Sequence, residues 1–206
     1  MKQLNSGIFL FKNVLKETQI QQLINVYDNN QCGFYRPVLS SGSRMSLKMN
    51  CLGHHWDAKD YKYYNNRTDV DGEVVKKMPQ EIIDIAKPFS LQAFPNHIPN
   101  WDICIINHYN PYQSKLGMHR DNSESKEMLE IGHPIVSFSI GASCLFTYGP
   151  KRNVYDEIKL DNGDVLLMGN ENRLYYHGVS SVEDNCEIDN GDIINYGRLN
   201  FTLRKM

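Results

Sequence analysis

The chain has 206 residues, 41% of them apolar and 22% charged, and its formal net charge at pH 7 is −2. This composition is typical of one globular domain, and it excludes a chain that is drawn to nucleic acid by its overall charge. No run of 18 apolar residues occurs and Lys12 interrupts the N-terminal apolar stretch, so we expect no transmembrane helix, no signal peptide and no membrane partner.

Two amphipathic helices are predicted in the first half of the chain. The first begins near Thr18 and ends at Asp28–Asn30. Its apolar residues recur at i, i+3, i+4 and i+7, at Ile20, Leu23, Ile24 and Tyr27. The second lies in 78–88, where Pro79 suits the first helical turn and Pro88 is expected to end the helix.

Residues 33–77, between the two helices, are rich in Gly, Asn, Tyr and charged residues. They predict irregular structure with short strands, over a length that favours a functional cover rather than a connector. Within them, 36–77 holds eight Lys or Arg against five Asp or Glu, whereas 183–192 holds five acidic residues and no basic one. Such uneven charge is typical of solvated loops, and a local patch that binds nucleic acid is the alternative.

From residue 101 onward the pattern changes to short strands and turns. Strands are expected in 102–109, 134–141, 144–149, 157–160, 165–169 and 195–204. Asn162-Gly163 predicts a tight hairpin, and the second DNGD sequence at 189–192 predicts another turn. Because helices are confined to the first half, this order indicates a mostly β, α+β fold, an antiparallel sandwich or jelly roll with a helical buttress, and not a parallel α/β sheet.

Five cysteines are scattered along the chain without a CxxC motif: Cys32, Cys51, Cys104, Cys144 and Cys186. An odd number at such spacing argues against a disulfide framework and against a thiolate zinc site, and it favours a reducing compartment. We therefore expect an intracellular protein, cytoplasmic or nuclear. We also expect it to act as a monomer.

The segment GMHRDNSES, residues 117–125, contains a histidine and an aspartate two positions apart. In a strand, His119 and Asp121 point to the same face and can bind one ion. With His177 as third ligand they form the facial triad of non-haem Fe(II) oxygenases, which leaves positions open for a co-substrate and O₂. The alternatives are a surface pair, a structural His177, or a zinc hydrolase with the same ligands. The remaining histidines are interpreted as structural or substrate-side: His54, His55, His97, His108 and His133.

The last predicted strand, RLNFTLR, carries polar and apolar side chains on opposite faces. One face has Arg198, Asn200, Thr202 and Arg204, and the other has Leu199, Phe201 and Leu203. Arginines on a strand that otherwise belongs to a core are costly unless they meet anions, and a dicarboxylate fits two guanidinium groups. Asn107 and Tyr109 share a face of the strand at 102–109 and are suitable donors to the same acid. The alternative is that both arginines reach solvent at the rim of the sheet.

These sequences together resemble the AlkB family of 2-oxoglutarate and Fe(II)-dependent dioxygenases. The resemblance rests on NHYNPYQSKLGMHRD, PIVSFSIG, NRLYYHG and RLNFTLR in this order, and it covers most of the chain. Within the family, LGHHWDAKDY and LGMHRDNSES are most similar to the subgroup of the first animal AlkB homologue. The resemblance implies a catalytic double-stranded β-helix over 101–206, and a helical buttress with a substrate cover over 1–100, in one compact domain.

The resemblance also implies roles for individual residues. Fe(II) would be held by His119, Asp121 and His177. The distal carboxylate of 2-oxoglutarate would bind Arg198 with help from Tyr109 and Asn200, and its keto-acid end would lie beside Asn107 and Arg204. Members of the family use O₂ to oxidise N-methyl groups on nucleobases, releasing formaldehyde, succinate and CO₂.

The resemblance further implies a substrate pocket, in which this chain departs from the family pattern. Many repair members have an acidic residue two positions after the metal-binding Asp, where this chain has Ser123, and this disfavours cationic alkylated bases. The base would be contacted by a set of cover and loop residues: His54 or His55, Trp56, Tyr61, Ser123 and Arg152. Ordinary packing of the loop is the alternative for the aromatic members of this set.

Three functions compete at this point. The leading one is demethylation of methylated nucleobases in DNA or RNA, as in DNA repair or RNA demethylation. The main rival is a 2-oxoglutarate oxygenase that hydroxylates a small molecule, a lipid or a protein side chain. The near-neutral charge, Ser123 and the acidic 183–192 favour this rival, whereas the basic 36–77 favours nucleic acid. A catalytically silent binding module is the third, and intact ligands and arginines argue against it.

Overall fold

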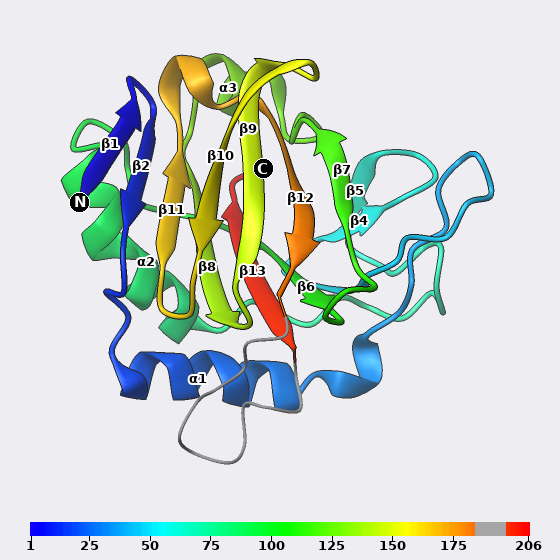
Figure 1. The fold of residues 1–206 in the computed structure, drawn as a ribbon. Coiled ribbons are helices and arrows are strands. Elements are labelled where there is room, and N and C mark those ends of the chain that lie inside the picture. Colours follow the sequence, from blue (N-terminus) through cyan, green and yellow to red (C-terminus); the bar gives the residue numbers. More distant parts are fainter. Residues whose placement is uncertain (184–196) are drawn as a thin grey trace.

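The computed structural model, which describes residues 1–183 and 197–206, has two antiparallel sheets packed face to face as a jelly roll (Figure 1). The larger sheet has the order β1 (Lys2–Asn5), β2 (Ile8–Phe11), β11 (Val165–Met168), β8 (Ile135–Gly141), β13 (Arg198–Arg204), β6 (Ile103–Tyr109) and β3 (Lys48–Leu52). The smaller sheet has the order β10 (Val154–Leu160), β9 (Cys144–Lys151), β12 (Tyr176–Val182) and β7 (Leu116–His119). The predicted antiparallel, mostly β fold is confirmed. The turn predicted at 189–192 lies outside the described residues.

Two long helices cover the outer face of the large sheet. Helix α1 (Glu17–Asp28) confirms the first predicted helix, with its apolar stripe buried. Helix α2 (Gln80–Ala93) begins as predicted, after Pro79. The shorter helices are α3 (Lys126–Glu130) and the 3₁₀ turns Gln31–Gly33 and Asn170–Asn172. Among the described helices, none has the length and apolarity to cross a membrane.

The prediction that Pro88 ends the second helix is wrong. Helix α2 continues past this residue to Ala93. Pro88 is exposed, so the carbonyl group that loses its helical hydrogen bond can be hydrated instead of buried. Beyond it, Phe89 packs edge-on against Phe11, with ring centroids 5.2 Å apart. Tertiary packing of the last turn therefore outweighs the local cost of the proline.

The hairpin predicted at Asn162-Gly163 is also wrong. Strand β10 before this turn pairs with β9 in the small sheet, whereas β11 after it pairs with β2 and β8 in the large sheet. The turn thus links the two sheets. The Asn162 side chain accepts a hydrogen bond from the Gly141 backbone at 3.0 Å, and Gly163 has a φ of +80°. A sequence suited to a tight turn does not determine which strands will pair.

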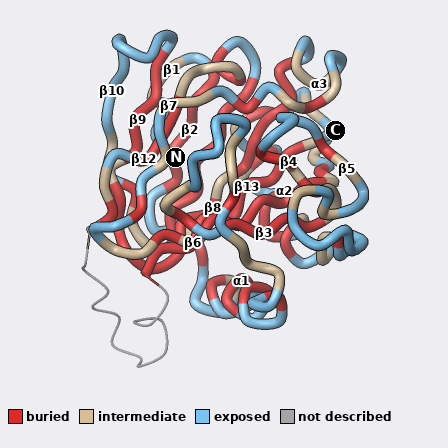
Figure 2. The backbone as a smooth tube through the Cα atoms, turned by 90° about the vertical axis from the view of Figure 1, so that its right-hand side faces the viewer, coloured by how far each residue is buried: buried red, intermediate tan, exposed pale blue. Residues whose placement is uncertain are grey.

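The interior consists of two cores, one on each side of the large sheet. Leu199, Phe201 and Leu203 belong to the core that packs against the helices. The second core lies between the sheets and includes Ile105 and Phe146. Figure 2 shows buried backbone concentrated in the strands, whereas β10, at the edge of the small sheet, is largely exposed. The polar face of β13 points into the layer between the two sheets.

The segment 33–77 is only partly irregular. It contributes β3 to the edge of the large sheet and forms a small hairpin from β4 (His55–Asp57) and β5 (Lys62–Tyr64). The large sheet also takes β1 and β2 from the first hundred residues, so its strands come from both sides of residue 100. The hairpin reaches the loop that follows β7, since Trp56 of β4 donates to Ser123 Oγ at 3.1 Å.

Candidate active site

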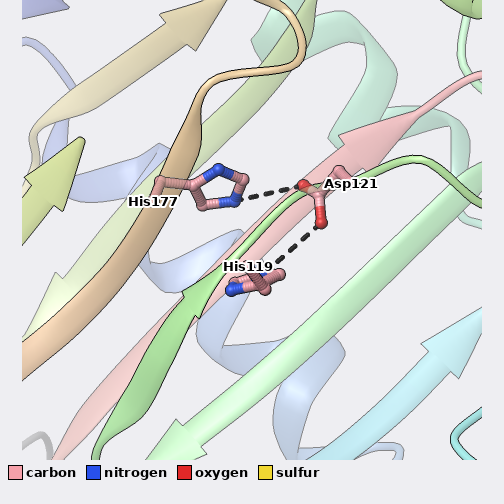
Figure 3. Close-up of side chains that lie close together, drawn as sticks. All are labelled: His119, Asp121 and His177. Atoms are coloured by element: carbon pink, nitrogen blue, oxygen red, sulfur yellow. Dashed lines mark ion pairs between the residues drawn. The ribbon is translucent and has the colours of Figure 1, made fainter. Parts of the chain in front are cut away.

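Three side chains, from two adjacent strands and the loop that follows one of them, meet at the open end of the layer between the sheets. His119 is the last residue of β7 and lies opposite His177 of β12 in the strand register. Asp121 follows two residues after the end of β7, so the backbone that presents it is no longer strand. Figure 3 shows both imidazoles facing the carboxylate, one directed at each of its oxygens. The predicted convergence of these three residues is present.

The geometry of this triad suits a metal ion. His119 Nε2 lies 3.4 Å from one Asp121 oxygen, and His177 Nε2 lies 3.3 Å from the other. One ligand atom from each residue can be chosen so that all three lie within 4.8 Å of one another. Two neutral imidazoles and one carboxylate are the donor set of non-haem Fe(II) oxygenases. The residues present therefore fit such an ion.

Backbone carbonyl groups orient both imidazole rings. His119 Nδ1 donates to Gly117 O at 3.0 Å, and His177 Nδ1 donates to Tyr175 O at 3.1 Å. A carbonyl only accepts, so each neutral ring carries its proton on Nδ1 and its free lone pair on Nε2, facing Asp121. Burial lowers the pKa of His177, although Asp121 opposes the shift, and this favours the neutral ring that metals require.

The Asp121 carboxylate is buried but strongly held in its charged form. Burial opposes its ionisation, yet the Arg204 guanidinium and His177 outweigh this effect and hold the pKa of Asp121 well below its usual range. Arg204 Nη2 lies 2.8 Å from Asp121 Oδ1. One Asp121 oxygen, Oδ2, has no hydrogen-bond partner despite its burial. A cation between Asp121 and the two imidazoles would satisfy this oxygen.

A buried network that the sequence did not reveal supports the triad. Arg173 donates to the backbone oxygen of Asp121 at 2.7 Å and forms an ion pair with Glu124 at 3.0 Å. Tyr63, from β5, donates to Glu124 and accepts from Arg204. These residues fix the loop that carries Asp121. The only sequence signal for them is proximity, since Glu124 lies within 117–125 and Arg173 lies four residues before His177.

Arg198 is a buried cation without a carboxylate partner among the described residues. Arg198 is 1% exposed and, within 1–183 and 197–206, its side chain donates only to Ser139 Oγ at 2.9 Å and to Ala142 O at 3.3 Å. Its Nε is buried without a partner. A charge in this state is unfavourable unless an anion compensates it. The guanidinium therefore points to an acidic ligand, in contrast to Arg204, which already binds Asp121.

The other residues predicted to bind the dicarboxylate lie beside Arg198. Strands β13 and β6 place Arg198 opposite Tyr109 and Asn200 opposite Asn107. All four line one narrow cavity with the triad. The Asn200 amide already donates to Ser137 Oγ at 2.7 Å and to Phe138 O at 3.1 Å, so it serves first to order the strands.

A second, larger cavity of about 430 Å³ opens from the triad toward the cover. It shares Asn107, His119, Asp121 and Arg204 with the narrow cavity. Trp56, Tyr61, Ser123 and Arg152 of the predicted substrate set line it, together with an apolar group formed by Leu39, Met45, Met49 and Met118. The Trp56 indole donates to Ser123 Oγ at 3.1 Å, so Ser123 orients this ring. The volume is ordinary for a pocket that holds one small ligand.

His54 and His55 do not line either cavity, although the sequence placed them beside the substrate. The His55 side chain is fully buried, and its Nε2 lies 2.6 Å from Asp69 inside the cover. Trp56, the next residue, points the other way because neighbours on a strand alternate. The three remaining histidines are structural: His108 pairs with Tyr27, His97 with Asn170, and His133 with the backbone oxygen of Ile98.

Comparison with known proteins gives consistent matches. The family model described as "2OG-Fe(II) oxygenase superfamily" matches residues 7–204. The DNA N(6)-methyladenine demethylase ALKBH1D of Arabidopsis thaliana is 35% identical over 98% of this chain. The alpha-ketoglutarate-dependent dioxygenase AlkB of Escherichia coli is 33% identical over 75% of this chain and 70% of its own.

The solved structure of OsALKBH1 is similar to this chain over 99% of its residues and 100% of that chain, with a TM-score of 0.84 and 32% identity. The chain spans about half the length of the three plant relatives that it matches, 50%, 48% and 45%. The similarity to OsALKBH1 therefore supports the fold, whereas the longer relatives contain further sequence that this chain does not match.

Proposed function

The chain belongs to the AlkB family of the 2-oxoglutarate and Fe(II)-dependent oxygenase superfamily, and on this premise we propose that it oxidatively demethylates N-methylated nucleobases in DNA or RNA. The observation that carries the proposal is the pairing of two sites in one cavity. The metal-binding triad and the unpaired Arg198 both line it, so a dicarboxylate held by the arginine lies beside the ion.

Each residue has a distinct task in this proposal. His119, Asp121 and His177 hold Fe(II). Arg198 and Tyr109 bind the distal carboxylate of 2-oxoglutarate, and Asn107 lies toward its keto-acid end. Arg204 keeps Asp121 ionised and in position, and through Tyr63 and Glu124 it ties the ligand loop to the cover.

Fe(II) held by His119, Asp121 and His177 would supply the oxidising chemistry, in which O₂ and 2-oxoglutarate are consumed, succinate and CO₂ are released, and the methyl group is hydroxylated. The hydroxymethyl group then leaves the base nitrogen as formaldehyde, and the nitrogen recovers a proton. The chain's residues position the methyl carbon and keep bulk water from the reacting centre.

The wider cavity suits a flat, neutral base. Trp56 and Tyr61 stand edge to face with ring centroids 5.7 Å apart, and the methionine and leucine side chains give the pocket apolar walls. Its basic lining residues are Lys115, Arg120, Arg152 and Arg204, whereas Asp121, which belongs to the triad, is the one acidic residue of the described chain that lines it. This balance disfavours a cationic base. N6-methyladenine, which appears in the names of three relatives, is neutral.

A formaldehyde-release assay tests the proposal. The iron-loaded protein would be given single-stranded DNA and RNA oligonucleotides that contain N6-methyladenine, with 1-methyladenine and 3-methylcytosine as cationic comparisons. We expect formaldehyde and succinate in equal amounts, and the fastest release from the neutral base. Omission of 2-oxoglutarate or addition of an iron chelator should stop both products.

Two results would contradict the proposal. Succinate released without formaldehyde from any methylated nucleic acid would assign the site to another substrate, such as a small molecule or a protein side chain. Faster release from the cationic bases would still support demethylase activity, but it would contradict the prediction that the basic lining of the cavity disfavours a cationic base.

A further inference from the structure

The cover has a hidden face, opposite the one that reaches the wider cavity. Strand β4 consists of His55, Trp56 and Asp57, and neighbours on a strand point to opposite sides. Trp56 lines the wider cavity, whereas His55 and Asp57 are buried on the other side. The segment 66–74, which follows β5, packs against that side and closes on itself through a β-bridge between its two ends. We call this segment the brace loop.

Two short hydrogen bonds join the brace loop to the hidden face of β4. His55 Nε2 donates to Asp69 Oδ1 at 2.6 Å, and both side chains are almost fully buried. Thr68 Oγ1 donates to Asp57 Oδ2, also at 2.6 Å. A hydrogen bond fixes both the distance and the direction between two groups, which apolar packing in the same place would not do. Two consecutive residues of the loop therefore hold two alternate residues of the strand.

Asp57 also shapes the turn that carries Tyr61. Its other carboxylate oxygen, Oδ1, accepts hydrogen bonds from the backbone N–H groups of Lys59 at 2.8 Å and Asp60 at 3.2 Å. Its backbone oxygen accepts from the Tyr61 N–H at 2.9 Å. Tyr61 has a φ of +58°, a conformation that is unfavourable for a tyrosine and needs such support. Thr68 therefore holds the carboxylate that folds this turn.

We propose that the brace loop, through Asp69 and Thr68, positions the aromatic wall that Trp56 and Tyr61 form in the wider cavity. This rests on the proposed function and adds positioning residues to it, since neither Asp69 nor Thr68 is among the described residues that line this cavity. A base that stacks on aromatic rings binds more tightly when the rings are already in place, because binding then costs no ordering of the cover.

The iron and 2-oxoglutarate sites are held by other contacts. Asp121 is fixed by Arg204 and Arg173, and Arg198 lies on β13, in the middle of the large sheet. Loss of the brace should therefore weaken the binding of the nucleic-acid substrate and leave the binding of 2-oxoglutarate unchanged. This difference distinguishes a positioning role from a general loss of structure.

Acrylamide quenching of tryptophan fluorescence tests the brace without any turnover. The chain has two tryptophans, and Trp101 is only 4% exposed, so quenching reports mainly on Trp56. Thr68→Val removes a hydroxyl group at an exposed position and should raise the quenching constant, whereas Thr68→Ser keeps the hydroxyl group and should retain the wild-type value. Asp69→Asn can still accept a hydrogen bond from His55 and should have a smaller effect than Asp69→Ala.

Steady-state turnover of a methylated oligonucleotide gives the second measurement. Thr68→Val should raise the oligonucleotide concentration for half-maximal formaldehyde release about five-fold, as expected for the loss of one hydrogen bond. The 2-oxoglutarate concentration for half-maximal turnover should not change. Glu73→Gln is the matched control, because it removes a negative charge from an exposed position of the same loop. It should behave like the wild type in both measurements.

Two results would overturn the proposal. One is a wild-type quenching constant and a wild-type oligonucleotide requirement in Thr68→Val, which decides the matter if Asp69→Ala does not fold. The other is an equal rise in the 2-oxoglutarate and oligonucleotide requirements, because the loop would then stabilise the whole fold. A wild type that releases no formaldehyde from methylated nucleic acid would refute the proposed function instead, and quenching would still decide whether the brace holds Trp56.

Discussion

The two faces of strand β13 have opposite chemistry although the same seven residues build both. Leu199, Phe201 and Leu203 face the helices in an apolar core, whereas the alternate residues place two arginines, an asparagine and a threonine between the sheets. All seven are buried. The apolar face therefore stabilises the fold, and the polar face holds buried charge that only a ligand or a neighbouring carboxylate can compensate. Because side chains alternate along β13, one face of the strand stabilises the core and the other face is available to bind ligands.

The largest effect is expected on the polar side, at the metal-binding triad. Asp121→Ala removes its carboxylate, and turnover should fall by at least roughly a thousand-fold. Product release and iron binding measured on the same sample check this. Turnover at the wild-type level in a folded variant would refute the assignment of the triad.

A substitution on the apolar face of β13 should lower the free energy of unfolding without weakening ligand binding. Phe201→Ala removes a ring that is 0% exposed, at a cost of roughly 3–5 kcal/mol in the free energy of unfolding. Urea titration measures this, and 2-oxoglutarate affinity of the fraction that remains folded should be close to that of the wild type. A weaker affinity with little loss of stability would show that the two faces are not independent.

The two arginines of the polar face sharpen the comparison further. Arg198→Met should raise the 2-oxoglutarate concentration for half-maximal turnover about 100-fold, because the anchoring charge is lost. Without 2-oxoglutarate its free energy of unfolding should be unchanged or higher, since an uncompensated buried cation has been removed.

Arg204→Met provides the matched control for Arg198→Met. It leaves Asp121 and Glu124 without their shared cation and should cost roughly 3 kcal/mol or more of stability. Denaturant titration of both variants without 2-oxoglutarate makes the comparison. Equal destabilisation by the two substitutions would mean that Arg198 is structural.

The smallest effect is expected at a buried histidine that is not part of the triad. Burial lowers the pKa of His133 from 6.5 to about 4, with His97, Arg173 and Lys205 also disfavouring its charge. Above pH 6.5 the ring is neutral in both states. Between pH 6.5 and about 4 the unfolded chain binds the proton and the folded chain does not, so stability falls as pH falls.

A pH series of unfolding curves tests this on the wild type and on His133→Gln, which can still donate to the Ile98 carbonyl group. The variant should lose less stability over the same range, since it has no proton to bind. Identical slopes in the two proteins would show that other groups cause the acid sensitivity.

Local pattern predicted the features that depend on neighbours along the chain. The stripe of α1 and the alternation of β13 both follow from residue spacing, and both are present. Pro88 and Asn162-Gly163 misled for the same reason. Each expresses a local preference. The packing of Phe89 outweighed the tendency of Pro88 to end the helix. The pairing of β10 and β11 with different sheets outweighed the hairpin preference of Asn162-Gly163.

By itself the sequence determined which residue types were available for a site: two histidines and a carboxylate for a metal, and arginines alternating with a core on one strand. Only the tertiary structure decided how they are used. Strand pairing placed His177 beside His119. Arg204 forms an ion pair with Asp121, whereas Arg198 has no carboxylate partner among the described residues. His55 points into the cover, and its neighbour Trp56 lines the cavity. The physical reason is that charge compensation and burial depend on contacts between distant segments, which residue spacing does not encode.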